Sequence, residues 1–289
     1  MRPLLTLHGA ALLAGMLALA PCTAAYAQST SAAAPGTASP SPADKPPSQV
    51  DLGLKFGLEP KALEILKAAS AKLAAAKTLR FTALATYESP ARTGQPLAYT
   101  SLYEVVLQRP NKLRVISPGD GPPSEYYYDG KTVMAYEPAA NLVAVAQAPG
   151  TIDEMLKAAF DIAAIYFPFT DLIVSDPYKD LSEGLKVAFY VGQSHVVAGT
   201  TTDIVVVAND TVQAQLWIGA ADHLPRMVRA TYFDEPGNYR HVVEFGNWKL
   251  NPSVPEGTFT SARAAAAPRM PFAAPPDRMP QPAAGAKKP

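Results

Sequence analysis

Hydrophobic and polar residues alternate with a period of two along two long segments and many short ones. In the first long segment, Leu79, Phe81 and Ala83 alternate with Arg80 and Thr82. Because successive side chains of a strand point to opposite faces of a sheet, this alternation predicts strands with one buried face. The pattern predicts about eleven strands, at residues 79–88, 99–108, 113–116, 126–128, 133–136, 142–146, 185–191, 202–208, 212–218, 226–233 and 239–248.

Two segments have a helical period instead. Residues 59–77 carry apolar side chains every three or four positions, with Pro60 near the start, where its missing N–H costs nothing. Thr151 and Glu154 form a capping box, and an apolar face follows until the Phe-Pro-Phe sequence at 167–169. We therefore expect one N-terminal and one central helix.

Short turn signals separate the predicted strands. The Arg109-Pro110-Asn111 sequence follows one strand directly, and Asp129-Gly130 is a strong hairpin signal because Gly adopts a positive φ. This order is typical of an antiparallel meander, in an α+β protein that is mainly β. A long antiparallel sheet with so few helices must curl to bury one face, and helices can cover its concave side.

The first 27 residues are typical of a secretory signal peptide. Arg2 precedes a short apolar run, and residues 25–27 have a small-x-small pattern, so we expect cleavage before Gln28. A lipoprotein signal ending at Cys22 is the alternative, which the preceding proline disfavours. Cys22 is the single cysteine, so the exported chain is expected to have no disulfide and to reside in a bacterial periplasm.

Composition divides the remaining chain into three parts. Residues 28–50 and 264–289 consist largely of small residues and proline, so we expect a disordered linker and a disordered tail. Residues 51–263 form one domain that is long enough for a substantial core and has a net charge of −4, against +3 for the tail. The domain has no basic stripe, so nucleic acid is not an expected partner. The basic tail suits contact with anionic lipid, with a glycan or with the acidic domain, although a solvated end is the simpler interpretation.

Several motifs resemble known families. A strand ending in Arg-Pro-Asn, an Asp-Gly-Lys hairpin and a Tyr-x-Pro sequence resemble the periplasmic lipoprotein carriers of the LolA/LolB type. Over residues 58–261 the chain is similar to a family of predicted periplasmic proteins of unknown function in the same superfamily. The residues that carry these resemblances are 104–114, 128–132 and 136–138 for the carriers, and 215–218, 224–226 and 247–252 for the family.

The resemblance implies an incomplete antiparallel β-barrel of about eleven strands, LolA/LolB-like, whose helices form a lid over a hydrophobic cavity for acyl chains. In the carriers the Arg of Arg-Pro-Asn holds the lid through hydrogen bonds to the backbone, and this residue corresponds to Arg109. A local charge pair at a strand end is the alternative interpretation of Arg109. We expect the ligand to contact Arg109, the inner-face residues Phe81, Tyr103, Val105, Leu107, Leu113 and Val115, and Phe160 of the central helix.

The sequence contains no constellation that is typical of an enzyme. His195, His223 and His241 lack metal-binding spacing and are expected on strand surfaces or in turns. Three aspartates between residues 171 and 180 lack the spacing of a calcium loop, so a solvated loop is expected there. We therefore expect no catalysis, no cofactor and no metal.

Two functions of different class remain open. The first is a binding protein that holds a hydrophobic small molecule or the acyl chain of a lipid or lipoprotein. The alternative is an envelope sensor or scaffold that acts through a protein partner. An open apolar cavity favours the first, whereas a filled interior with an exposed apolar patch favours the second. We expect a monomer, and peripheral membrane contact is compatible with either function.

Overall fold

The computed structural model describes residues 57–119, 123–233 and 237–274, so the expected signal peptide and the linker at 28–50 lie outside the described residues. The helices are α1 (Pro60–Ala75), α2 (Ile152–Ala163), α3 (Thr170–Ile173), α4 (Pro177–Ser182) and α5 (Ala262–Ala266). The strands are β1 (Thr78–Pro90), β2 (Pro96–Gln108), β3 (Lys112–Ser117), β4 (Ser124–Tyr128), β5 (Thr132–Glu137), β6 (Leu142–Gln147), β7 (Val187–Ser194), β8 (Thr202–Ala208), β9 (Val212–Gly219), β10 (Pro225–Tyr232), β11 (Arg240–Leu250) and β12 (Arg269–Met270).

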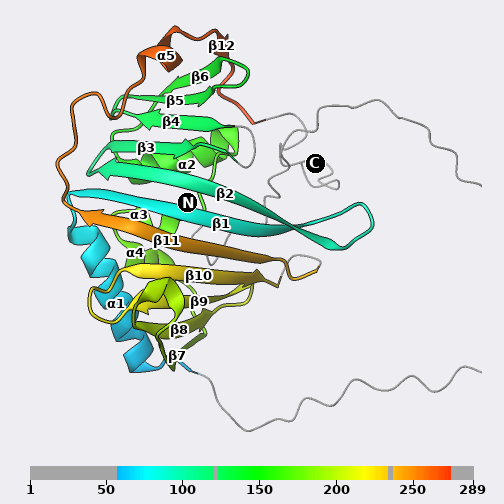
Figure 1. Ribbon diagram of the computed structural model, residues 1–289, viewed down its shortest axis with the longest axis vertical. Coiled ribbons are helices and arrows are strands. Elements are labelled where there is room, and N and C mark those ends of the chain that lie inside the picture. Colours follow the sequence, from blue (N-terminus) through cyan, green and yellow to red (C-terminus); the bar gives the residue numbers. More distant parts are fainter. Residues whose placement is uncertain (1–56, 120–122, 234–236, 275–289) are drawn as a thin grey trace, which may run out of the picture. The chain divides into compact units, whose positions relative to one another are not determined.

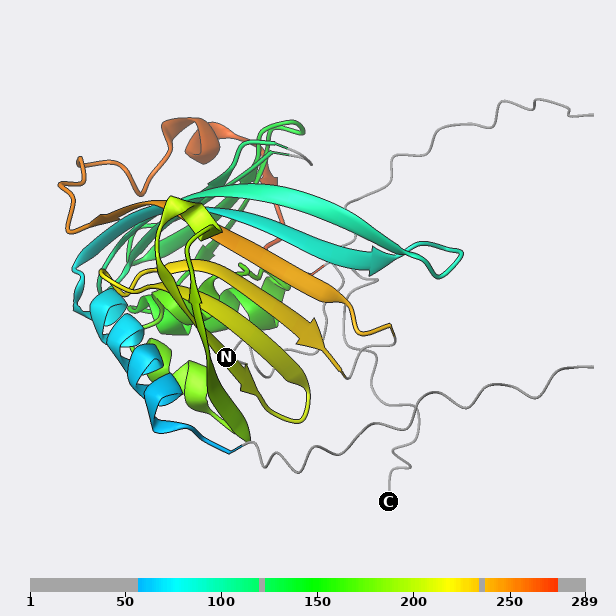
Figure 2. The same cartoon turned by 60° about the horizontal axis from the view of Figure 1, so that its bottom comes forward.

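The twelve strands form one sheet, in the order β12-β6-β5-β4-β3-β2-β1-β11-β10-β9-β8-β7 (Figure 1). Neighbouring strands are antiparallel, except that β12 runs parallel to β6. The sheet ends at β12 and β7 and curls without closing (Figure 2). All eleven predicted strands are present, and the predicted incomplete barrel is confirmed.

The concave face of the sheet carries the main hydrophobic core, and helices α1 to α4 cover it (Figure 2). The two predicted helices are confirmed as α1 and α2. Helix α1 buries residues of one face, including Leu66 and Leu73. The predicted capping box begins α2, where the Thr151 hydroxyl accepts a hydrogen bond from the Glu154 N–H at 3.2 Å.

Helices α3 and α4 are short and were not predicted from the sequence. Asp176 caps α4 by accepting a hydrogen bond from the Lys179 N–H at 3.1 Å. The expectation of a solvated loop is wrong for Asp171, which is fully buried. Its neighbours Leu172 and Ile173 belong to the main core, so the whole turn of α3 is buried with them.

The convex face of the sheet carries a second, smaller core under the C-terminal segment. Ala264 and Ala267, on and just after α5, are buried against Tyr127, Tyr136 and Val143 of β4, β5 and β6. The Arg263 Nε donates a hydrogen bond to the Tyr136 hydroxyl at 2.9 Å, and β12 then extends the sheet beside β6. The expectation of a disordered tail from residue 264 is therefore wrong for residues 264–274. Small alanine side chains allow close packing on the sheet there, although their composition resembles a linker.

The β1–β2 hairpin is longer than its neighbours and projects beyond the rest of the sheet (Figure 1). The ends of β10 and β11 lie at the same end of the sheet, which we call the hairpin end. At the β7 edge of the sheet, residues 57–59 pair in part with β7 through Leu58 and Ala188. No helix among the described residues is long and apolar enough to cross a membrane.

Candidate functional site

The Arg-Pro-Asn corner connects β2 to β3 and lies beside the start of α2. The Arg109 N–H donates a hydrogen bond to the Lys77 carbonyl at 2.8 Å, and the Pro110 carbonyl accepts one from the Ile152 N–H at 2.9 Å. The Arg109–Pro110 peptide bond is cis. The corner therefore joins the α1–β1 connection to the first residue of α2.

The Asp-Gly-Lys turn between β4 and β5 contacts the Arg-Pro-Asn corner. A Cβ atom added to Gly130 would lie 2.6 Å from the Asn111 Nδ2 atom and 3.2 Å from the Asn111 carbonyl oxygen. Gly130 also has a φ of 98°, which side chains rarely adopt. Only glycine fits this turn without displacing Asn111. The Arg-Pro-Asn and Asp-Gly-Lys motifs thus form one contact in space.

The side chain of Arg109 is partly buried at this corner, where it lies within electrostatic range of Asp153 on α2. Its Nε and Nη2 atoms are buried and have no hydrogen-bond partner. Burial lowers the pKa of Arg109, and the charge of Asp153 on α2 opposes this effect. The expected hydrogen bonds from Arg109 to the lid backbone are not formed by these two nitrogens.

Asp153 connects the beginning of α2 to the end of the α3 turn. Its carboxylate accepts hydrogen bonds from the Ser175 N–H at 3.0 Å and the Ser175 hydroxyl at 2.5 Å. Helix α2, the connecting segment and α3 are therefore held together at this point. We call residues 152–175 the lid segment, because they lie over the concave face.

The five aliphatic and aromatic strand residues predicted to line a trough lie in the main core, on the concave face. Each is at most 3 % exposed, and they are Phe81, Val105, Leu107, Leu113 and Val115. Tyr103 is partly buried against the same core, whereas Phe160 is half-buried on α2 and does not belong to it. The structure thus brings the strand residues together and leaves Phe160 apart. Their contact with a ligand stays a prediction.

Aromatic side chains of the lid segment lie directly over these strand residues. The Phe169 ring meets the Phe81 ring edge-on at 5.5 Å and the Tyr103 ring at 5.6 Å, and it stacks on Phe167 at 5.6 Å. On its other side Phe81 stacks on Trp248 at 4.4 Å. The sequence pattern by itself places Phe167 and Phe169 only at a helix end. Phe167 and Phe169 are two residues apart, on either side of Pro168, and in a locally extended chain this spacing indicates that both rings point to the same side.

A row of aromatic residues continues from this cluster to the hairpin end. Burial raises the pKa of Tyr166 well above its usual range, with contributions from Tyr232 and Tyr103. The Tyr232 ring contacts the His241 ring at 4.8 Å, and Tyr87 stacks on Tyr99 at 5.7 Å beside His241. The row therefore runs along the concave face, from buried Phe81 to half-exposed Tyr99.

The hairpin end also exposes apolar side chains. Tyr99 is 42 % exposed, Leu97 is 46 % exposed and Phe233 is 47 % exposed. His241, expected on a strand surface or in a turn, is instead half-buried in the aromatic row, and burial lowers its pKa to about 4. A neutral imidazole at pH 7 fits this apolar surrounding.

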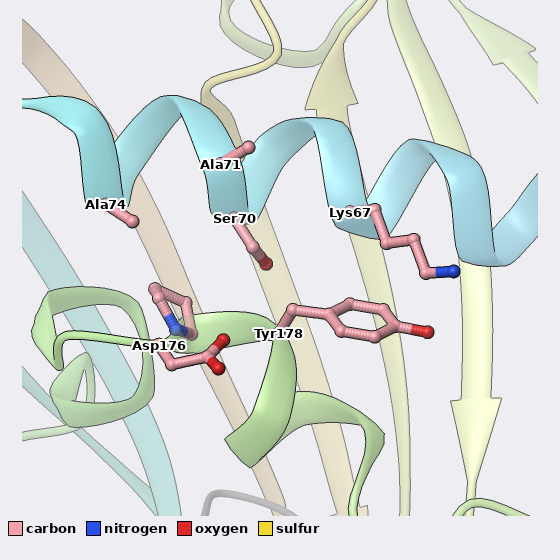
Figure 3. A pocket seen from close by; sticks show the side chains of 7 residues that line it. Lys67, Ser70, Ala71, Ala74, Asp176 and Tyr178 are labelled. Carbon is pink, nitrogen blue, oxygen red and sulfur yellow. The ribbon is translucent and has the colours of Figure 1, made fainter.

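A separate pocket of about 220 Å³ lies between α1 and α4 (Figure 3). Ser70 points from α1 toward α4, and its buried hydroxyl has no hydrogen-bond partner. Lys67 lies 5.2 Å from the centre of the Tyr178 ring at the rim. Its volume is below the roughly 300 Å³ at which ligand pockets begin, so we do not assign a ligand to it.

Metal chemistry has no candidate among the described residues. No group of three or more His, Cys, Asp or Glu side chains lies together in ranges 57–119, 123–233 and 237–274. His195 and His223 lie in connections between strands, as expected. His223 occupies a turn with a φ of 58°, and His195 Nδ1 lies 3.0 Å from the Thr201 hydroxyl.

Comparison with protein families gives one match, which covers residues 62–273. The chain belongs to the family described as "Predicted periplasmic protein (DUF2092)". This confirms the family and the periplasmic location that the sequence motifs and the leader predicted. No curated protein matches the chain. The description of the family names a compartment, the periplasm, and names no ligand or activity.

Solved structures with a similar fold include LprF from Mycobacterium bovis, with 14% identity over 69% of this chain and 98% of that chain and a TM-score of 0.43. A LolA superfamily protein from Nitrosomonas europaea has 8% identity over 69% and 97% of the two chains and a TM-score of 0.34. The MucA/MucB complex from Pseudomonas aeruginosa has 17% identity over 70% and 61% and a TM-score of 0.39. None of these similarities assigns a ligand to this chain.

Proposed function

We propose that the protein is a periplasmic, non-enzymatic binding protein that holds an acyl chain between the concave face of the half-barrel and the lid segment. The observation that carries this proposal is the Arg109 guanidinium, which has two buried donor nitrogens without an acceptor. Leaving a buried polar group unpaired costs about 1–3 kcal/mol, and more for a charged group. An acyl chain that carries a carboxylate or ester oxygen supplies the missing acceptor.

The surroundings of Arg109 suit the rest of such a ligand. Leu107 and Leu113 flank the corner on the concave face and are fully buried under the lid segment. Burying one methylene group contributes about 0.8 kcal/mol. A chain of about sixteen carbons contributes about 13 kcal/mol. After an association and ordering cost of about 5 kcal/mol, this leaves about micromolar affinity.

Binding requires the lid segment to move. Phe169 packs against Phe81 and Tyr103, so an acyl chain that reaches these residues must displace the Phe169 ring. The aromatic row leads from this point to the hairpin end and gives the chain a continuous apolar path. The lid segment can move as one unit, because Asp153 and Ser175 tie its two ends.

Displacement of a fluorescent fatty acid from the purified mature protein tests the proposal. We expect displacement by long-chain fatty acids with wild type, and at least tenfold weaker binding for Arg109→Leu. Arg229→Leu is the matched control, because Arg229 is also half-buried but lies on the convex side of β10. Equal affinity of the two variants, or no binding by wild type, contradicts the proposal. Mass spectrometry of organic extracts from the native protein identifies the ligand.

A second candidate function is binding of a protein partner at the hairpin end, as a sensor or scaffold. Two observations favour it. Core side chains fill the concave face under the lid segment, and Leu97, Tyr99 and Phe233 are exposed at the hairpin end. A photo-crosslinker placed at Tyr99 should capture one periplasmic protein, and the same group at Arg92 on the hairpin tip should not. Identical patterns at both positions contradict this function.

A further inference from the structure

The convex face of the sheet carries a polar groove that the acyl-binding proposal does not use. The groove has a volume of about 340 Å³ and crosses β11, β1, β2 and β3. Its polar lining comes from Arg80, Thr82, Glu104, Arg114, Asn247 and Lys249. The groove therefore contains three cationic side chains and one carboxylate, that of Glu104.

The register of the sheet explains why the cations converge. Arg80 lies opposite Lys249 on β11 and opposite Val106 on β2, and Val106 lies opposite Arg114 on β3. Like charges directly opposite each other on neighbouring strands destabilise a sheet. Within the described ranges, none of these three cations forms an ion pair with a carboxylate. The cost of placing Arg80 beside Lys249 is thus not offset inside the described part of the protein.

A β-bulge adds a further donor to the groove. The β1–β11 register shifts between Arg80 and Thr82, and Asn247 has a φ of 56°. The Asn247 Nδ2 donates a hydrogen bond to the Thr82 hydroxyl at 3.2 Å, which holds the amide over the groove. On the other face the neighbouring Trp248 stacks on Phe81. Bulges redirect side chains in this way.

We infer that this groove binds the phosphate group of an anionic phospholipid, at a membrane surface. Two guanidinium groups and an ammonium group match the oxygens of a phosphate in charge and in number of donors. Leu84 continues the same face of β1 after Arg80 and Thr82, is 40 % exposed, and lies opposite Leu102 on β2. A cationic groove beside an exposed leucine fits a lipid headgroup next to its acyl region. A periplasmic location places the protein between membranes that present such lipids.

This inference is independent of acyl binding, because the groove and the lid segment lie on opposite faces of the sheet. A protein that lacks the acyl site can still bind a membrane through the groove. Conversely, the acyl chain is held under the lid segment without any contribution from Arg80 or Lys249.

Co-sedimentation of the mature protein with vesicles tests the groove. We expect binding to phosphatidylglycerol vesicles, weak binding to phosphatidylcholine vesicles, and loss of binding as salt is raised. Each Lys or Arg near an anionic surface contributes roughly a fivefold gain in binding, so Arg80→Gln, Arg114→Gln and Lys249→Gln together should weaken it about a hundredfold. Lys131→Gln, in the exposed β4–β5 turn, is the matched control and should bind as wild type. All variants keep the basic C-terminal residues, so the difference reports the groove.

Glu104→Gln is the complementary variant, since it removes the single carboxylate of the groove and should strengthen vesicle binding several-fold. It also keeps the test decisive if the triple variant fails to fold, which a melting curve shows. Vesicle binding that is unchanged in both groove variants, or absent in wild type, overturns the inference. Stabilisation of wild type by glycerol phosphate without vesicle binding overturns the membrane source and assigns the groove to a free phosphate ligand.

Discussion

At the scale of single residues, His241 should make stability depend on pH. Burial lowers its pKa from 6.5 to about 4, so between these values the unfolded chain binds a proton that the folded chain does not. Stability therefore falls as the pH is lowered from about 6.5 to about 4, by at most about 3 kcal/mol. Urea unfolding at pH 7 and at pH 4.5 measures the change.

His241→Phe removes this titration and keeps a ring between Tyr87 and Tyr232. We expect the variant to lose less stability than wild type over the same pH interval. Carboxylates without an interaction with His241, such as Asp222, titrate equally in both proteins. A difference between the two curves thus reports His241, and parallel curves would show that the imidazole is not buried in solution.

Replacement of Gly130 should be costly, because a close contact and a positive φ act on it together. Gly130→Ala forces a Cβ against Asn111 and a strained φ, so we expect a loss of about 2–3 kcal/mol in the free energy of unfolding. Gly94→Ala is the control, because its φ of 88° is similar but nothing lies within 4 Å of the added Cβ. The control should lose only about 1 kcal/mol. Equal losses in chemical denaturation would mean that the contact with Asn111 is not required.

At the scale of elements, the C-terminal segment should stabilise the β3–β6 half of the sheet. A chain that ends at Ser261 loses α5 and β12, and it exposes Tyr127, Tyr136 and Val143. We expect a loss of at least about 2 kcal/mol in denaturant unfolding, from the apolar area returned to water. A chain that ends at Ala274 keeps both elements and is the control. If the two truncations unfold alike, the second core contributes nothing to stability.

At the scale of the whole molecule, acyl binding should be linked to folding. A ligand that binds only the folded chain stabilises it by about 2.7 kcal/mol at a free concentration of one hundred times its Kd. The melting temperature of wild type should therefore rise with fatty acid, and Arg109→Leu should respond only at higher concentrations. Displacement of the probe without any rise in melting temperature would place the bound probe outside the folded core.

The sequence predicted the strands of this fold well because their alternation is a local property. Strands β1, β3 and β9 show their buried face in their own residues. The Thr151 capping box likewise begins α2 through contacts within four residues. The inner-face residues of β1, β2 and β3 follow directly from this period of two. Helices α3 and α4 lack such a signal, because a helix of four or six residues spans fewer than two helical turns and so repeats no apolar pattern.

The sequence by itself therefore determined the compartment, the family, the open antiparallel sheet and the identity of its buried face. The tertiary structure decided what lies against those faces. It placed Phe167 and Phe169 over the strand residues, joined Gly130 to Asn111, folded residues 264–270 onto the convex face, and gathered Arg80, Arg114 and Lys249 in one groove. The physical reason is that these contacts depend on register and on packing between segments far apart in the chain. Local propensity and composition carry no information about such pairs.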